Sequence, residues 1–241
     1  MSTPSKGAVS TPDKWPSRYG TTPAKLQLVP CGAYTFNSEH FQETVTLIVG
    51  IEKKAYNVRK DLLCFYSDYF RAAFQGSFKE ATERKIDLPR VTKDVFEHFQ
   101  VWRYTRKLDT AALTFDTMAR LWIFGDKHQI PLLQNQVMDS IFAKCTTTKN
   151  IDPGALPAVY ARTVARSPLR KAFIEIIGWT VGIESEPDTF LSRNAVNWTN
   201  EIFVDLVIAV HQSRVSQDVK FPALPKRDKC FFHIHSKDEH C

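Results

Sequence analysis

Apolar runs in the first half of the chain predict strands. Residues 44–49 form a β-branched apolar run that ends at Gly50, and a second apolar run at 55–58 follows after a polar turn. Two such runs joined by a short polar turn predict a β-hairpin. A third run, at 85–88, ends before Pro89 and predicts one more short strand.

Helical spacing of the apolar residues begins after residue 60. Leu62, Leu63 and Phe65 share one short predicted helix, and Ser67 stands where it can cap the next. Thr92 occupies the same kind of position before another helix. Because residues three and four apart share a helix face, the predicted buried stripes are Tyr69, Phe70, Ala73 and Phe74 after Ser67, and Val95, Phe96, Phe99 and Trp102 after Thr92.

Two more amphipathic helices are predicted, one at 118–128 and one that begins at Pro131. Gly125 lies inside the first of them, where glycine costs about 1 kcal/mol relative to alanine, so we expect a neighbouring helix to approach closely there. Pro131 suits a first helical turn because its missing N–H is not needed there. The predicted buried stripe of the second helix is Leu133, Val137 and Ile141.

The flanking parts of the chain differ in composition. Residues 1–40 begin with a proline-rich polar stretch and are predicted to be mostly disordered, apart from a short apolar run at 26–29 that could form a strand. Residues 148–215 show helical patterns alone, and residues 216–241 form a polar tail. The predicted helices of this half are 156–166, 169–179, 188–194 and 201–214, with Pro153, Pro168 and Pro187 at their boundaries.

Composition narrows the class of protein. The 241 residues are 43% hydrophobic, which is enough for a sizeable core. No apolar stretch approaches the roughly 20 residues that span a bilayer. The five cysteines are odd in number, and no apolar run near the start resembles a secretory signal, so we expect the cytoplasm, the nucleus or both. The net charge of +6 is dispersed along the chain, and we expect no direct nucleic-acid binding.

The run at 56–74, YNVRKDLLCFYSDYFRAAF, resembles the signature of the BTB/POZ family, in which a strand leads into a pair of short helices. IDLP at 86–89 and IPLLQN at 130–135 continue the match in the family's order. The resemblance covers residues 41–147, and its character is that of fungal BTB proteins that carry a helical region after the domain. It implies an α+β fold, with a small sheet flanked by helices, followed by an all-α extension.

BTB domains similar to this one are non-enzymatic modules for protein–protein interaction, through which chains form homo- or hetero-oligomers and scaffolds. In dimeric relatives the first helix and the N-terminal strands contact the partner, which implicates Leu62, Leu63, Phe65 and the run 26–29. The same residues could instead complete the monomer's own core, and the sequence leaves both interpretations open. The expected partner is a second copy of this chain or another BTB protein.

Some BTB proteins are substrate adaptors for cullin-based ubiquitin ligases. The resemblance then implicates Val95, Phe96, Glu97 and Tyr104 in contact with a cullin scaffold. Phe96 and Tyr104 could equally be packing residues. No recognisable substrate-binding repeat follows, so residues 148–241 would have to bind the target.

Other relatives are transcription-associated regulators that recruit corepressors through a charged pocket. An aspartate before the first strand and a basic residue after the second build that pocket. Thr44 and Lys60 stand at the matching positions, and Arg59 replaces the signature histidine. The acidic half of the pocket is therefore missing from the matched position, which argues against this role.

Cysteine and histidine gather near the carboxyl end, at Cys230, His233, His235, His240 and Cys241. Thiolates and imidazoles are the usual zinc ligands, and Cys-x-x-His-x-His spacing can bring three of them to one ion. The cluster predicts either a structural zinc site, with Cys230, His233, His235 and Cys241 as ligands, or a polar tail without metal. No other cofactor is expected.

An enzyme is the competing class of function. The sequence holds no Gly-x-Ser-x-Gly elbow, no phosphate-binding glycine loop and no His-Glu-x-x-His helix. Cys64 stands beside Phe65 on an apolar helix, where a thiol is typically inert packing. We therefore predict no enzymatic activity.

Overall fold

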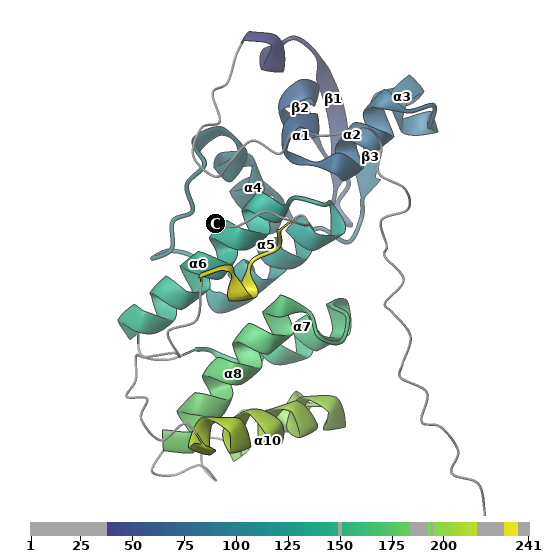
Figure 1. Ribbon diagram of the computed structural model, residues 1–241. Coiled ribbons are helices and arrows are strands. Elements are labelled where there is room, and N and C mark those ends of the chain that lie inside the picture. Colours follow the sequence, from purple (N-terminus) through teal and green to yellow (C-terminus); the bar gives the residue numbers. More distant parts are fainter. Residues whose placement is uncertain (1–37, 149–150, 184–191, 194, 216–228, 236–241) are drawn as a thin grey trace, which may run out of the picture. The chain divides into compact units, whose positions relative to one another are not determined.

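The computed structural model describes residues 38–148, 151–183, 192–193, 195–215 and 229–235 (Figure 1). A three-stranded sheet follows the short 3-10 helix at residues 38–41. Strand β1 (Thr44–Val49) pairs antiparallel with β2 (Lys54–Arg59) and parallel with β3 (Lys85–Leu88), in the order β2-β1-β3. The hairpin and the third strand are thereby confirmed. Gly50 adopts a φ of 75° in the turn after β1, a conformation that suits glycine.

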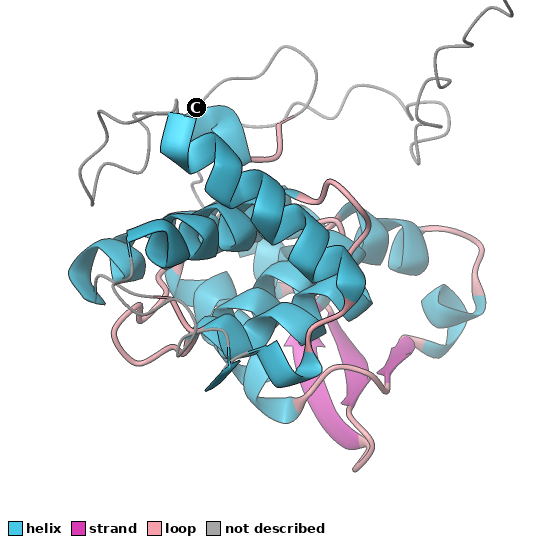
Figure 2. Ribbon diagram, turned by 90° about the horizontal axis from the view of Figure 1, so that it is seen from below, coloured by secondary structure: helices cyan, strands magenta, loops and turns pink. Residues whose placement is uncertain are grey.

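The sheet has one buried and one solvent-facing side, and Figure 2 shows the three strands next to one another with helices beside them. Side chains alternate between the two faces of a strand, so Val45, Leu47 and Val49 of β1 point into the core. Tyr56 of β2 packs against Phe96, with the ring centroids 4.7 Å apart. The opposite face carries Thr46, Ile48, Ala55, Asn57, Lys85 and Asp87.

Two short helices follow the hairpin, α1 (Lys60–Tyr66) and α2 (Asp68–Gln75). Ser67 caps α2 as predicted, because its Oγ accepts a hydrogen bond from the Phe70 N–H at 3.0 Å. The same hydroxyl donates to the His128 carbonyl at 2.5 Å, so one side chain joins α2 to the more distant α5. A short helix that the sequence analysis did not predict, α3 (Lys79–Glu83), precedes β3.

Three longer helices complete this half: α4 (Lys93–Thr105), α5 (Phe115–Lys127) and α6 (Pro131–Thr148). Thr92 is the N-cap residue of α4, but its side chain makes no capping hydrogen bond. Helix α5 begins three residues earlier than predicted because Thr114 caps it, accepting from the Thr117 N–H at 3.1 Å. The close approach at Gly125 is confirmed, since a Cβ there would lie 2.8 Å from Gln134 Cγ of α6.

His128 closes α5 inside an aromatic cluster and is only 1% exposed. Its ring stacks on Phe70, with centroids 5.2 Å apart and planes 5° apart, and lies 4.2 Å from the Phe124 ring. Its Nδ1 is 2.8 Å from the Phe124 carbonyl oxygen. Burial lowers the pKa of the imidazole to about 4, because an apolar surrounding disfavours the charged form.

The extension is helical, as predicted: η2 (Pro153–Ala155), α7 (Leu156–Arg162), α8 (Pro168–Ile183), η3 (Ala195–Asn197) and α10 (Asn200–Val215). Helix α7 ends four residues before the predicted boundary, because Thr163 turns to an extended conformation. Helices α8 and α10 lie so close that a Cβ at Gly178 would be 2.8 Å from the Ala209 Cβ.

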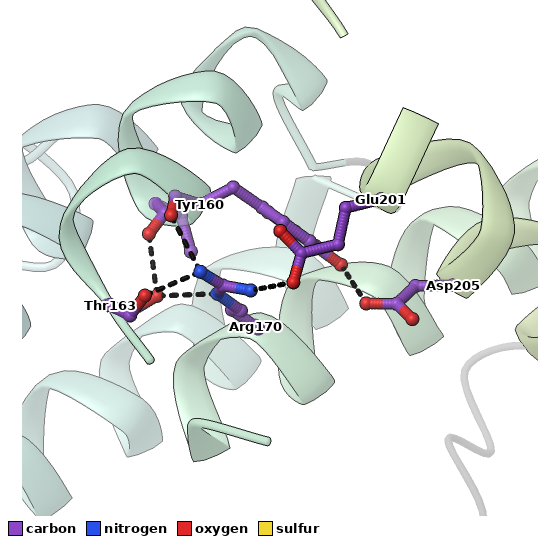
Figure 3. Close-up of polar contacts among 6 residues, drawn as sticks. Tyr160, Thr163, Arg170, Glu201 and Asp205 are labelled. Atoms are coloured by element: carbon purple, nitrogen blue, oxygen red, sulfur yellow. Dashed lines mark hydrogen bonds and ion pairs between the residues drawn. The ribbon is translucent and has the colours of Figure 1, made fainter. Parts of the chain in front are cut away.

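A buried arginine joins the three main helices of the extension (Figure 3). Arg170 of α8 is 7% exposed and donates to the Tyr160 and Thr163 carbonyls at 2.6 and 2.5 Å. Its Nη1 lies 2.5 Å from Glu201 Oε1 at the start of α10. Tyr160 of α7 in turn donates its hydroxyl to Asp205 of α10 at 2.7 Å. The network therefore sets the position of α10 on α7 and α8.

Some predicted features fall outside the described residues. The run 26–29 and nearly all of the predicted disordered lead-in are among them, although residues 38–40 belong to the short 3-10 helix η1 (Ser38–Phe41). Of the predicted helix 188–194, Ser192 and Arg193 alone are described, and both are helical. Within the described ranges, every helix is too short or too polar to cross a bilayer.

Candidate functional site

Helix α1 carries the residues predicted for a dimer interface. Leu62 and Leu63 are 0% exposed and belong to the chain's own core. They have no free surface for a partner, so their contribution is to the stability of the monomer. Phe65 is partly buried and packs edge-on against Tyr66 at 5.1 Å. Of the three, Phe65 alone keeps surface that a second chain can reach.

Helix α4 carries the predicted cullin-type face, and the structure divides its residues. Val95 and Phe96 are buried in the core. Glu97 accepts hydrogen bonds from Lys54 at 3.2 Å and from the Tyr56 hydroxyl at 3.0 Å, which hold the pKa of Glu97 below its ordinary value. Glu97 therefore ties α4 to β2.

Two apolar side chains near the end of α4 point into solvent. Tyr104 is 49% exposed, and Val101, which the sequence analysis did not single out, is 58% exposed. They are three residues apart and so lie on one helix face. The guanidinium of buried Arg103 lies 4.8 Å from the centroid of the Tyr104 ring, which supports the ring from the protein side. This pair is the accessible part of the predicted cullin face.

The charged positions at the start of the hairpin differ from the pattern predicted for a corepressor pocket. Thr44 is exposed at the matched position, and Glu43, one residue earlier, supplies the carboxylate. Lys60 Nζ lies 2.8 Å from Glu43 Oε2 and lowers the pKa of that carboxyl group. Arg59 donates to the Phe41 carbonyl at 2.9 Å. An acid and a base do meet here, but they pair with each other at the surface.

The carboxy-terminal cluster is only partly described. His233 Nε2 lies 2.9 Å from Asp139 Oδ1, and the rings of His233 and His235 are 5.8 Å apart. The side chain of Cys230 and all of His240 and Cys241 lie outside the described residues. Among the side chains that are described, no group of three metal-binding residues forms. The zinc site stays a prediction.

The cysteine considered as a nucleophile is buried. Cys64 lies in the core, with its Sγ 3.6 Å from the Phe70 carbonyl oxygen. Burial raises the pKa of its thiol to about 11, because the thiolate would lose its hydration. The nucleophilic form is therefore scarce at neutral pH.

Helix α10 exposes an apolar strip that the sequence analysis did not predict. Its buried face, Ile202, Leu206 and Ala209, lies toward α8. The exposed strip is Phe203, Val204, Val207 and Ile208, which are between 38% and 68% exposed. The sequence did carry a signal for this strip, because the helix is apolar on nearly all sides. Such a helix is typically covered by more than one neighbour. Exposed apolar patches of this kind are typical of protein-binding surfaces.

Comparison with known proteins identifies one family. Residues 35–144 match the BTB/POZ domain. No curated protein matches the chain. The matched span contains the sheet and helices α1–α6 except the last turn of α6. BTB/POZ domains are in general modules for protein–protein interaction rather than enzymes.

Proposed function

We propose, from the premise that residues 35–144 are a BTB/POZ domain, that this protein is a non-enzymatic interaction module that assembles with itself or with another BTB protein. The match to the BTB/POZ domain carries the proposal. The exposed strip of α10 supports it, because a monomer rarely leaves four neighbouring apolar side chains in water without a binding role. The cytoplasm, the nucleus or both are the proposed compartment. A fungal type remains a prediction.

The proposed contact between two copies lies around α1 and η1. Phe65 and Phe41 keep exposed apolar surface there. Arg59 fixes the backbone of η1 through its bond to the Phe41 carbonyl, so this surface is presented on ordered backbone. A self-complementary patch of this kind gives a closed dimer when two copies meet about a twofold axis.

Phe41→Asp is expected to weaken self-association about tenfold or more, because it places a charge in an apolar contact. Light scattering should give twice the chain mass of 27.6 kDa for the natural protein at micromolar concentration, and a mass near one chain for the variant. Val196→Asp, at a highly exposed position in η3, is the matched control and should remain dimeric. A monomeric mass for the natural protein contradicts the proposal.

A second proposed function is that of adaptor for a cullin-based ubiquitin ligase. The exposed pair Val101 and Tyr104 favours it, because α4 presents both to solvent at the place where the resemblance puts the cullin. Aromatic side chains at such positions often dominate binding energy. The core residue Phe96 cannot serve as a contact residue, since it is fully buried.

Val101→Asp combined with Tyr104→Ala is expected to reduce capture on immobilised cullin by about tenfold or more. Val164→Asp, at an exposed position after α7, is the control and should be captured like the natural protein. Thermal unfolding of each variant checks that the fold is kept. Failure of the natural protein to bind any cullin tested counts against the adaptor function and leaves self-association to be judged by light scattering.

A further inference from the structure

Residues 229–235, here called the docked tail, lie on α6 and α8. Three residues of α6, Asn135, Asp139 and Phe142, are four and three positions apart and so share one helix face. The Phe232 ring lies 5.0 Å from the Phe142 ring and is buried. Lys171 of α8 places its Nζ 3.8 Å from the centroid of the Phe231 ring. Together, Asn135, Asp139, Phe142 and Lys171 form the tail-docking face; Figure 1 shows the docked tail in yellow across α6.

Asn135 binds the main chain of the docked tail through both polar atoms of its side-chain amide. Its Nδ2 donates to the Ile234 carbonyl at 3.0 Å, and its Oδ1 accepts from the Ile234 N–H at 2.7 Å. An asparagine side chain can bind both the N–H and the carbonyl of one residue in another segment, because its amide carries a donor and an acceptor side by side. Such recognition requires an N–H at that residue, which excludes proline.

The docked tail leaves space beside it. A cavity of about 220 Å³ is lined by Arg106, Leu108, Gln136, Asp139 and Ser140, and no described tail residue lines it. Asp139, which contacts His233, is itself a wall of this cavity. A ligand with a longer side chain than the tail provides would gain contacts there. The tail-docking face therefore adjoins a hollow, open to solvent, that the described tail residues do not line.

We propose that the tail-docking face is a binding site for a short segment of a partner protein, and that the chain's own tail occupies it as an internal competitor. The partner segment has an aromatic residue at the position of Phe232, an imidazole or cationic residue facing Asp139, and a residue other than proline at the position of Ile234. This chemistry is taken from the segment seated on the face. The proposal is independent of dimerisation through α1.

Competition sets the size of the expected effect. A segment tethered to its own binding site has an effective concentration in the millimolar range, so a free peptide of equal intrinsic affinity is largely excluded. Weakening the internal tail leaves a larger fraction of the faces unoccupied. The apparent affinity of the free peptide then rises in proportion to that fraction.

The test uses a fluorescein-labelled peptide of residues 229–235, with Cys230→Ser, and measures its fluorescence anisotropy on the full chain with EDTA present. Full chains that carry Phe232→Ala or Ile234→Pro are expected to bind this peptide about tenfold more tightly than the natural chain does. Adding Asn135→Ala to either variant should weaken binding about tenfold, because two hydrogen bonds are lost. Asn57→Ala, on the sheet, is the matched asparagine control and should change nothing.

A second peptide, identical except for Ile234→Pro, lacks the N–H from which Asn135 Oδ1 accepts and is expected to bind about tenfold more weakly than the first. Equal affinity of the first peptide for the natural chain and for both tail variants overturns the proposal. An affinity of the tail variants that Asn135→Ala leaves unchanged also overturns it. Ile234→Pro leaves the Phe232 ring in place and removes one N–H of the tail. It therefore tests the site even where Phe232→Ala disturbs packing.

Discussion

Lowering the pH from 7 to 4 is expected to reduce the free energy of unfolding by about 3 kcal/mol more in this protein than in a His128→Phe variant. The imidazole is enclosed by Phe70 and Phe124, and burial holds its pKa at about 4, against 6.5 for a solvated histidine. The neutral ring is therefore favoured in the folded state.

The direction of this pH effect follows from the lowered pKa of His128 in the folded protein. Above pH 6.5 the histidine is neutral in both states, and its contribution to stability is fully present. As the pH falls from 6.5 toward 4, the unfolded chain takes up a proton that the folded chain does not, and this contribution is lost. A phenylalanine keeps the stacking on Phe70 and Phe124 but cannot titrate.

Urea unfolding of both proteins at pH 7, 5.5 and 4 measures the difference. The carboxylates are common to both proteins, so their titration cancels in the comparison. His211→Phe, at an exposed position on α10, is a control for the loss of a histidine and should follow the natural protein. Parallel loss of stability in the natural protein and in His128→Phe contradicts the expectation.

Arg170→Met is expected to lower the free energy of unfolding by about 3 kcal/mol. Arg170 is the sole donor among the described contacts to the Tyr160 carbonyl, and it also binds the Thr163 carbonyl and Glu201. Methionine keeps much of the side-chain volume but cannot donate. Buried carbonyl oxygens that lose a donor retain the full cost of lost hydration.

Glu201→Gln is the matched control at the other end of the ion pair. Glu201 is about half exposed, so its charge is partly screened, and we expect a loss of about 1 kcal/mol. Chemical denaturation measures both variants, and hydrogen exchange should show faster opening of α10 in Arg170→Met than in the natural protein. A stability for Arg170→Met within about 0.5 kcal/mol of the natural value contradicts the role given to this network.

The sequence predicts local elements well where one physical cause dominates. Apolar runs bounded by turn residues located β1–β3, the hydroxyl of Ser67 located the start of α2, and the cost of a helical glycine pointed to the close contact at Gly125. Each of these signals arises from a few neighbouring residues. The start of α5 was missed because its actual cap, Thr114, lies before the predicted helix at 118–128.

Surface residues were harder to assign because periodicity cannot separate core from interface. Leu62 and Leu63 look alike in either role, and the structure places both in the core. Val101 and the strip on α10 are apolar yet exposed. Their exposure depends on which neighbouring elements cover them, and the periodicity of one helix does not show this. The docked tail joins Asn135 and Ile234, 99 positions apart, and no local pattern indicates such a contact.

The parallel pairing of β1 with β3 has a consequence for synthesis on the ribosome. The hairpin can form as soon as β2 emerges, but β3 follows only after α1, α2 and α3 have been made. Until then one side of β1 offers unpaired N–H and C=O groups, in the same way as an edge strand that invites pairing with other chains. Nascent chains that stall between Arg59 and Lys85 should therefore need protection from pairing with other chains along this side of β1.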